Sequence, residues 1–106
     1  AERYIETEVA LALSYRVVSL QAKGVIPNYE ASAVKLFSTE LNQRIARTGM
    51  KVLGLYGQLS RRSRWSVLQG RLYYSYLRSV ANTIEGGTSE IQRNVIAQRG
   101  LGLPRD

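Results

Sequence analysis

Two long stretches with apolar residues at three- and four-residue steps constrain the fold of this chain most. The first stretch covers residues 2–23 and ends at Gly24, and the second runs from about residue 29 to about residue 53. The apolar positions are Ile5, Val9, Ala12, Leu13, Val17 and Leu20 in the first stretch, and Val34, Phe37, Leu41, Ile45 and Val52 in the second. The spacing predicts two amphipathic helices that turn these residues toward a shared core.

The connection between the two stretches, "GVIPNYE", is short and breaks the helical pattern. Pro27 cannot continue a helix, Asn28 is a suitable N-cap, and Glu30 is favourable in the first turn of a helix. A short connection places consecutive helices antiparallel. We therefore expect the two helices to pair as an antiparallel hairpin.

The rest of the chain predicts a loop and two shorter helices. Residues 54–65 contain Gly54 and Gly57 and are expected to form an internal loop, with a helix restarting near Trp65. The third helix carries Leu72, Tyr73, Tyr76, Leu77 and Val80 and ends before Gly86. The fourth runs from about Ser89 to Arg99, buries Ile91, Val95 and Ile96, and stops at Gly100. No stretch alternates with period two, so residues 1–106 predict a single all-α domain, an antiparallel bundle of three to four helices.

The composition excludes several classes of site and protein. The chain has 106 residues with no histidine and no cysteine, which removes the commonest general base, thiol chemistry and nearly all structural zinc sites, so we expect no metal site. The longest apolar run, "VALAL", is far short of the ~20 residues of a membrane-spanning helix, so no membrane insertion is expected.

The lack of cysteine is compatible with a cytoplasmic location. Because the chain starts at Ala1 already in a helical pattern, we expect a fragment or processed domain.

The junction before the last helix, "EGGTSE", is the strongest candidate for a binding site. Two glycines allow close approach of a ligand, and the start of a helix attracts anions such as phosphate. Thr88 or Ser89 can cap the helix, and Ser89 with Gln92 fits a capping box. A plain turn with a cap explains most of these residues too, and the residues alone favour that simpler interpretation.

Two further clusters and one acid leave alternatives open. The stretch "SRRSRW" combines Arg61, Arg62 and Arg64 with Trp65, as in contacts to phosphates and bases, although a solvated loop explains it as well. The tyrosines at positions 73, 74 and 76 cannot all face one core, so a subunit interface is as good an explanation as a bundle core. Glu85 could act as a base if burial raised its pKa, but most glutamates at helix ends face water.

The closing sequence "GGTSEIQRNVIAQRGLGLPR" strongly resembles the end of the acyl-CoA dehydrogenase family of flavoproteins. The likeness runs nearly without interruption from Ile84 to Arg105. It extends more weakly upstream, where "YIETEVALALSYRVVSLQAKG" and "EASAVKLFSTELNQRIARTGMKVLG" are similar to two long antiparallel helices of the family's C-terminal domain. The resemblance therefore covers the whole chain.

The resemblance implies a larger flavoenzyme of which this chain is the C-terminal helical part. Such enzymes oxidise an acyl-CoA thioester to its 2,3-enoyl product, as a carboxylate takes the α-proton and a hydride passes to FAD, and they assemble as dimers or tetramers. Carried over by position, Gly87, Thr88, Ser89 and Glu90 match the motif that approaches FAD. With this, the junction reads as a cofactor site rather than a plain turn.

Two departures from the family pattern affect the expected site residues. Many members place the catalytic glutamate where this chain has Gly86, and Glu85 sits one residue early. The resemblance therefore implies no catalytic residue in this chain, with Glu85 as a second choice. Near the end of the second helix, Lys51 and Leu55 replace a glutamine and a glycine that contact the FAD of a neighbouring subunit, which leaves Lys51 and Gly54 as doubtful contacts.

The leading hypothesis is thus the FAD-contacting and oligomerising domain of an acyl-CoA dehydrogenase, inactive as an isolated fragment. Its expected partners are an acyl-CoA substrate and other subunits, identical or different, but no nucleic acid. The net charge of +7 suits phosphate-rich ligands. The alternatives are a free-standing basic helical module that binds nucleic acid or an acidic protein, and a structural bundle that dimerises through Tyr73 and Tyr76.

Overall fold

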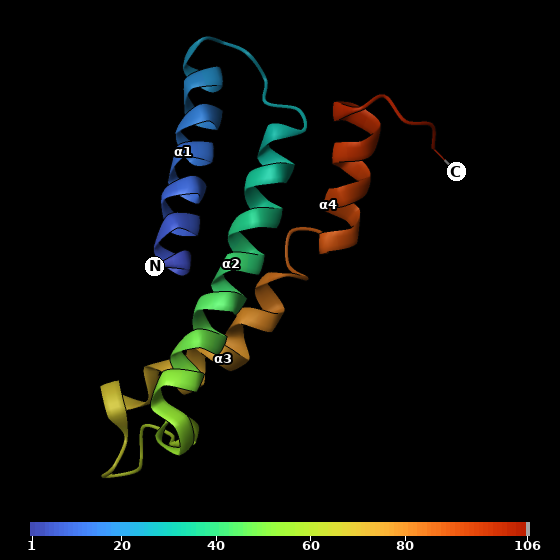
Figure 1. Cartoon of the computed structure of the whole chain (residues 1–106). Coiled ribbons are helices and arrows are strands. Elements are labelled where there is room, and N and C mark those ends of the chain that lie inside the picture. Colours follow the sequence, from blue (N-terminus) through green and yellow to red (C-terminus); the bar gives the residue numbers. More distant parts are fainter. Residues whose placement is uncertain (106) are drawn as a thin grey trace.

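Helix α2 (Glu30–Leu53) runs through the middle of the molecule, and the other long elements pack along it (Figure 1). The computed structural model describes residues 1–105. Helix α1 (Glu2–Ala22) lies antiparallel to the first half of α2, and α3 (Arg71–Asn82) lies along its second half. Helix α4 (Ser89–Val95) packs on the side of α2 away from α1 and continues as a π-helical turn, η3 (Ile96–Gly100). The predicted all-α antiparallel bundle of three to four helices is confirmed for the described residues, which form four α-helices.

The ends of the long helices follow from local backbone chemistry. Helix α1 ends with the paired hydrogen bonds of a Schellman motif, from the N–H of Gly24 to the carbonyl of Gln21 and from the N–H of Val25 to that of Leu20. Asn28 was predicted to be the N-cap of α2, but it does not occupy that position. The N-cap position falls on Tyr29, and the Glu30 carboxylate instead accepts a 3.1 Å hydrogen bond from the backbone N–H of Asn28.

Residues 54–70 differ in detail from the expected loop. Two short 3-10 helices, η1 (Gly54–Gln58) and η2 (Val67–Gly70), flank a segment of turns that contains Trp65. The third helix therefore begins at Arg71 rather than near Trp65. Leu68 and Gln69, directly before α3, have positive φ, and this left-handed backbone sets the later start of the helix.

The inner face of α1 agrees only in part with the one that the spacing predicted: Leu13, Val17 and Leu20 face inward, but Ile5, Val9 and Ala12 do not. Ala10, Leu13, Val17 and Leu20 are half-buried, whereas Ile5 and Val9 are exposed. The reason is that α2 is the main neighbour of α1, so the seam centred on Leu13 and Val17 defines the contact and leaves Ile5 and Val9 at its flank.

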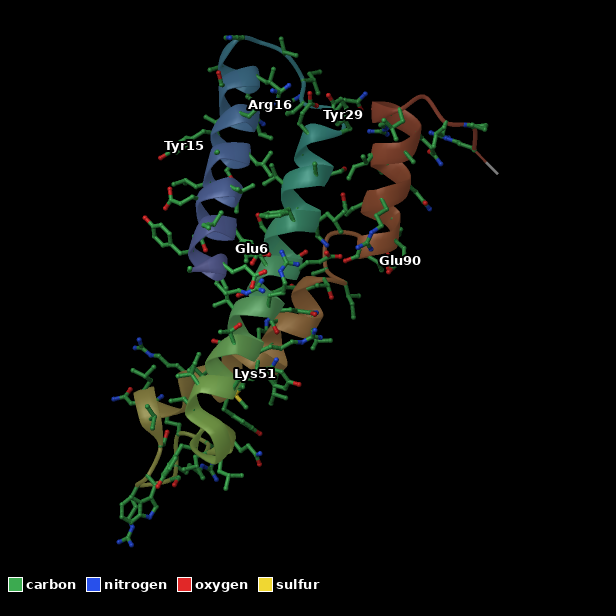
Figure 2. All side chains as sticks on the ribbon, in the orientation of Figure 1. Glu6, Tyr15, Arg16, Tyr29, Lys51 and Glu90 are labelled. Atoms are coloured by element: carbon green, nitrogen blue, oxygen red, sulfur yellow. The ribbon has the colours of Figure 1, made fainter. Side chains whose placement is uncertain are left out.

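The outer face of α1 is apolar as well. Tyr4 is 71% exposed and Tyr15 is 66% exposed, and Leu11 and Val18 lie on the same side of the helix. Figure 2 shows Tyr15 directed away from α2. A helix that is apolar on two opposite faces is typical of one that is covered on both sides.

The core is small. Leu41, at 3% exposed, and Ala46, both on α2, are the buried apolar residues. Several residues that were predicted to face the core are exposed, because neighbours cover only parts of the surface of α2: Ile45, Val52, Leu77, Val80 and Ile91.

The overall dimensions also indicate that little of the chain is buried within itself. The radius of gyration is 17.0 Å, whereas a compact domain of this length has about 13 Å. The accessible surface is 7823 Å², roughly 1,900 Å² more than the ~5,900 Å² expected for a compact monomer of this mass. The chain is more extended, and exposes more surface, than a compact domain of its length. Among residues 1–105, no helix combines the length and apolar character needed to cross a membrane.

Candidate functional site

The connection between α3 and α4, residues 83–88, forms a tight corner halfway along α2 (Figure 1). Gly86 and Gly87 both have positive φ, +66° and +95°, which L side chains rarely adopt. The N–H of Ser89 closes the corner with a 3.2 Å hydrogen bond to the carbonyl of Thr83. We call residues 83–90 the glycine corner.

Two side chains hold the carbonyl groups of the glycine corner. Lys35 of α2 donates a 2.5 Å hydrogen bond from Nζ to the carbonyl oxygen of Gly87, and Gln92 donates a 3.0 Å bond from Nε2 to that of Gly86. Gln92 is buried, and the space at the α-carbon of Gly87 is so narrow that a Cβ would lie 2.7 Å from Gln92 Nε2. Both carbonyls are therefore turned into the protein.

Thr88 is the N-cap of α4, as one of the two predicted candidates. Its hydroxyl oxygen accepts a 3.3 Å hydrogen bond from the backbone N–H of Ile91. The alternative capping box of Ser89 and Gln92 does not form, because Gln92 is committed to the carbonyl of Gly86 and Ser89 is buried.

Several backbone donors of the corner remain available. Within residues 1–105, the N–H groups of Gly87, Thr88 and Glu90 donate to no acceptor. Unpaired N–H groups at a helix start favour ligands with anionic or polar oxygens. The corner thus has the donors that a phosphate, a hydroxyl or a carbonyl group of a ligand requires.

A polar hollow of about 440 Å³ opens beside the glycine corner. Its walls come from α2, the end of α3 and the start of α4: Glu40, Gln43, Arg44, Arg47, Thr83, Ser89, Glu90 and Arg93. Glu40 bridges the walls through a 2.5 Å ion pair with Arg93, and Gln43 donates a 3.2 Å hydrogen bond to the hydroxyl of Thr83. These contacts fix the distance between α2 and the corner.

Glu85 is poorly placed to act as a base. Its side chain is 58% exposed and forms a 2.8 Å ion pair with Arg78. The hydrogen bond from Arg78, reinforced by the charge of that guanidinium, lowers the pKa of the Glu85 carboxyl below its ordinary value. A more acidic carboxyl is a weaker proton acceptor, and the opposing effect of desolvation, which raises the pKa, is the smaller one here.

The two doubtful cofactor contacts lie away from the corner. Figure 2 shows Lys51 low on α2 and Glu90 at the start of α4. Lys51 is exposed, and Gly54 ends α2 with no atom within 4 Å of the position that a Cβ would occupy. Neither residue can share a small ligand group with Gly87, so each would belong to a separate contact.

The arginine cluster "SRRSRW" does not form one surface. Arg64 stacks over the ring of Trp65, 4.8 Å from its centroid, and Trp65 is 63% exposed. Arg61 and Arg62 instead line a hollow with Arg71, Tyr73 and Tyr74. The structure thus separates residues that the sequence places side by side.

Sequence reasoning missed Lys35 and Gln43 at the corner. Each contacts a residue at least 36 positions away, and each lies on a helix where it reads as an ordinary polar residue. Only the antiparallel packing of α2 with α3 and α4 brings them there. No group of side chains among residues 1–105 could hold a metal ion.

Comparison with known proteins identifies the family. Residues 1–101 match the family described as "Acyl-CoA dehydrogenase, C-terminal domain". The chain is 35% identical to the acyl-CoA dehydrogenase FadE26 of Mycobacterium tuberculosis over 99% of its own length and 27% of that protein. It is 34% identical to the acyl-CoA dehydrogenase IpdE1 of Mycolicibacterium smegmatis over 99% of this chain and 26% of that one. The chain thus spans about a quarter of the length of these relatives.

Solved structures agree with the sequence comparison. The ChsE4–ChsE5 complex of Mycobacterium tuberculosis matches 97% of this chain and 26% of that one, with a TM-score of 0.87 and 33% identity. The structure titled "Tcur3481-Tcur3483 steroid ACAD" matches all of this chain and 28% of that one, with a TM-score of 0.93 and 28% identity. By sequence and by fold, this chain belongs to the acyl-CoA dehydrogenase family and corresponds to its C-terminal domain.

Proposed function

We propose that this chain is the C-terminal part of an FAD-dependent acyl-CoA dehydrogenase and that its glycine corner contacts the cofactor. The observation that carries the proposal is the set of free backbone donors at Gly87, Thr88 and Glu90; the bonds of Gln92 and Lys35 to the preceding carbonyls orient the first two. The ribityl and pyrophosphate oxygens of FAD are suitable acceptors for such donors. The residues present therefore fit the cofactor that the family uses.

The glycine corner is proposed to bind and orient the cofactor, whereas the hydride acceptor and the catalytic base are supplied by other groups. FAD, when bound, supplies the acceptor for the hydride removed from the acyl chain. Thr88 keeps the proton of its hydroxyl for a ligand, because its oxygen accepts the capping bond from Ile91. Glu85 is exposed and ion-paired, so we place the catalytic base outside these 106 residues. The isolated chain is accordingly expected to be inactive.

Cofactor content of the full-length protein tests this proposal. Thr88→Val removes the hydroxyl at nearly constant volume, and we expect FAD affinity to fall roughly tenfold from the loss of one polar contact and a looser helix start. Thr48→Val on α2, whose hydroxyl bonds only to the Arg44 carbonyl, is the matched control. Absorbance of bound flavin per polypeptide, measured over a range of FAD concentrations, compares them. Equal affinity of both variants and the unmodified protein would refute cofactor contact at the corner.

Assembly with further subunits is the second part of the proposed function. The chain carries excess surface and an uncovered apolar face on α1, formed by Tyr4, Leu11, Tyr15 and Val18. One similar structure is a ChsE4–ChsE5 complex, and another carries the double name Tcur3481-Tcur3483. These features favour a hetero-oligomer in which α1 contributes to a contact between protein parts.

The mass of the full-length assembly tests the role of α1. Leu11→Glu places a charge in the apolar face, and we expect the assembly to dissociate into smaller species in sedimentation. Ile26→Glu introduces the same charge at a position that is 88% exposed in the connection between α1 and α2, and serves as the control. If the two variants sediment as the unmodified protein does, the α1 face is not an assembly surface.

For the substrate, we propose an acyl-CoA with a bulky, steroid-like acyl group. The support is the similarity over the whole chain to a structure titled as a steroid acyl-CoA dehydrogenase. Turnover of the full-length enzyme with a steroid-derived acyl-CoA, compared with a straight-chain acyl-CoA of equal concentration, tests this. A preference for the straight-chain compound would rule out the steroid class.

A further inference from the structure

The positive charge of this chain is concentrated in one part of the molecule. Residues 41–84 contain no aspartate or glutamate and eight basic residues, a net charge of +8, whereas the remainder has seven basic and eight acidic residues, a net charge of −1. The eight are Arg44, Arg47, Lys51, Arg61, Arg62, Arg64, Arg71 and Arg78. Residues 41–84 form the second half of α2, the η1 and η2 region and α3, the lower end in Figure 1. This end attracts anions independently of the glycine corner.

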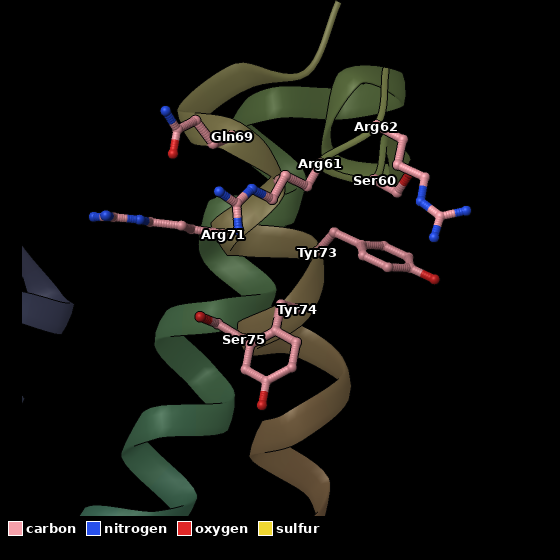
Figure 3. Close-up of a pocket in the computed structure, with 9 residues that line it drawn as sticks. Ser60, Arg61, Arg62, Gln69, Arg71, Tyr73, Tyr74 and Ser75 are labelled. Atoms are coloured by element: carbon pink, nitrogen blue, oxygen red, sulfur yellow. The ribbon is translucent and has the colours of Figure 1, made fainter. Parts of the chain in front are cut away.

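A hollow of about 510 Å³ lies in this basic end, between the segment after η1 and the start of α3. Its lining is mainly apolar, and it includes three arginines and two tyrosines: Arg61, Arg62, Arg71, Tyr73 and Tyr74. Figure 3 shows these side chains around the hollow, with Arg61 and Arg71 beside Gln69, and Tyr73 beneath Arg62. The volume is within the range of about 300–1,000 Å³ that small-molecule sites occupy.

The arginines at this hollow have no counter-charge in the described part of the chain. Arg61, Arg62 and Arg71 take part in no ion pair and no side-chain hydrogen bond, whereas Arg78 is paired with Glu85. A guanidinium without a partner has all its donors available in a planar fork that matches phosphate geometry. The hollow thus offers up to three unpaired guanidinium groups as hydrogen-bond donors to an anionic group.

A run of residues with positive φ borders the hollow and includes two of its lining residues, Gln69 and Gly70. Leu68 and Gln69 have φ of 50° and 54°, a left-handed conformation that is rare for residues other than glycine. Gly70 continues this run, and a Cβ there would lie only 2.6 Å from the backbone nitrogen of Arg61. Such strain is retained mainly where a site requires it. Gln69 and Gly70 line the hollow, and α3 begins directly after them at Arg71.

From these observations we infer that the hollow binds a nucleoside phosphate. The free arginines hold the phosphate oxygens, and the phenol rings of Tyr73 and Tyr74 supply flat apolar surface for the base. Within the described residues, Tyr73 and Tyr74 are 37% and 66% exposed. The site lies at the far end of α3 from the glycine corner, and its existence does not depend on FAD contact there.

Binding of ADP to the full-length protein tests the inference. The unmodified protein, the double variant Arg61→Gln/Arg71→Gln and the control Arg16→Gln are titrated with ADP by calorimetry. Arg16 is exposed on α1 and forms no ion pair in the described residues, so its replacement removes one charge at the other end. We expect at least roughly tenfold weaker binding for the double variant, from the loss of two charge-assisted contacts, and unchanged binding for the control.

Two further measurements locate the site and identify the ligand class. Photo-crosslinking with an azido derivative of ADP is expected to label the peptide that contains Tyr73 and Tyr74. Inorganic pyrophosphate is expected to bind roughly tenfold more weakly than ADP, because it lacks a base for the rings. Unchanged ADP binding in the double variant, labelling only elsewhere in the protein, or equal affinity for pyrophosphate and ADP would each overturn the inference. Calorimetric titration with coenzyme A, compared with that with free ADP, shows which of the two nucleotides the site binds more tightly.

Discussion

The ammonium group of Lys35 on α2 lies 2.5 Å from the carbonyl oxygen of Gly87, a residue 52 positions further along the chain. This bond fixes the orientation of the peptide unit that joins Gly87 to Thr88. Because the carbonyl points to Lys35, the N–H of Thr88, on the other side of the same peptide plane, points away from it. A residue of the central helix thus sets the direction of a donor at the proposed cofactor site.

Replacing Lys35 by methionine should loosen the glycine corner. Methionine keeps most of the unbranched, apolar length of the side chain but cannot donate, and loss of a charge-assisted bond typically costs about 1.5–3 kcal/mol. We expect a lower thermal midpoint and a lower flavin content of the full-length protein. Lys23→Met is the control, since Lys23 is exposed just after α1. Identical flavin content in the two variants would mean that Lys35 does not orient the corner.

The two glycines of the corner should differ in their tolerance of alanine. Both have positive φ, which costs a residue with a Cβ about 1–2 kcal/mol. At Gly86 there is open space, but at Gly87 the added methyl group would lie 2.7 Å from the amide of Gln92 and displace it. We therefore expect Gly87→Ala to lower the thermal midpoint clearly more than Gly86→Ala. A reversed order would show that the Gln92 contact is not required.

Glu85→Gln should change stability only in a defined pH range. Arg78 lowers the folded-state pKa of Glu85, so the pair stabilises the fold above the ordinary pKa of the carboxyl, about 4.3, and this contribution is lost as the pH falls through the lowered value. The difference in thermal midpoint between the unmodified protein and Glu85→Gln should therefore be small at neutral pH and vanish in acid. Glu8→Gln, at an exposed position of α1, corrects for the change in net charge. A difference that grows on acidification would contradict the lowered pKa.

Leu41 should be the most sensitive leucine of α2. It is 3% exposed, and truncation of a buried leucine to alanine typically costs about 2–5 kcal/mol through lost burial and a cavity. Leu55→Ala, at an exposed position, should cost within about 0.5 kcal/mol. Chemical denaturation of the two variants measures the contrast. Similar midpoints would imply that Leu55 is covered in the assembled protein.

Much of the fold could be predicted from local signals. Gly24 and Pro27 mark the connection between the long helices because one ends a helix and the other cannot continue it. Thr88 was identified as a possible cap because its hydroxyl can reach the third residue of the helix. These effects act within one turn of chain, so the sequence itself contains them.

Other features depend on contacts that the sequence does not display. The inner face of α1 was predicted too broadly, because Ile5 and Leu13 are equally apolar and only the position of α2 distinguishes them. The left-handed run at Leu68 and Gln69 could not be predicted, since residues with a Cβ avoid that conformation in isolation. Lys35 was missed at the site because its partner is a backbone carbonyl, which every residue has.

The two apolar faces of α1 also bear on how the protein is made in the cell. Until something covers Tyr4 and Tyr15, the outer face offers a newly synthesised chain a surface for aggregation and for recognition by chaperones and proteases. The lifetime of an unassembled copy should therefore depend on how quickly its covering surface arrives. Balanced synthesis of the protein parts that meet on α1 would then regulate how much of this chain survives.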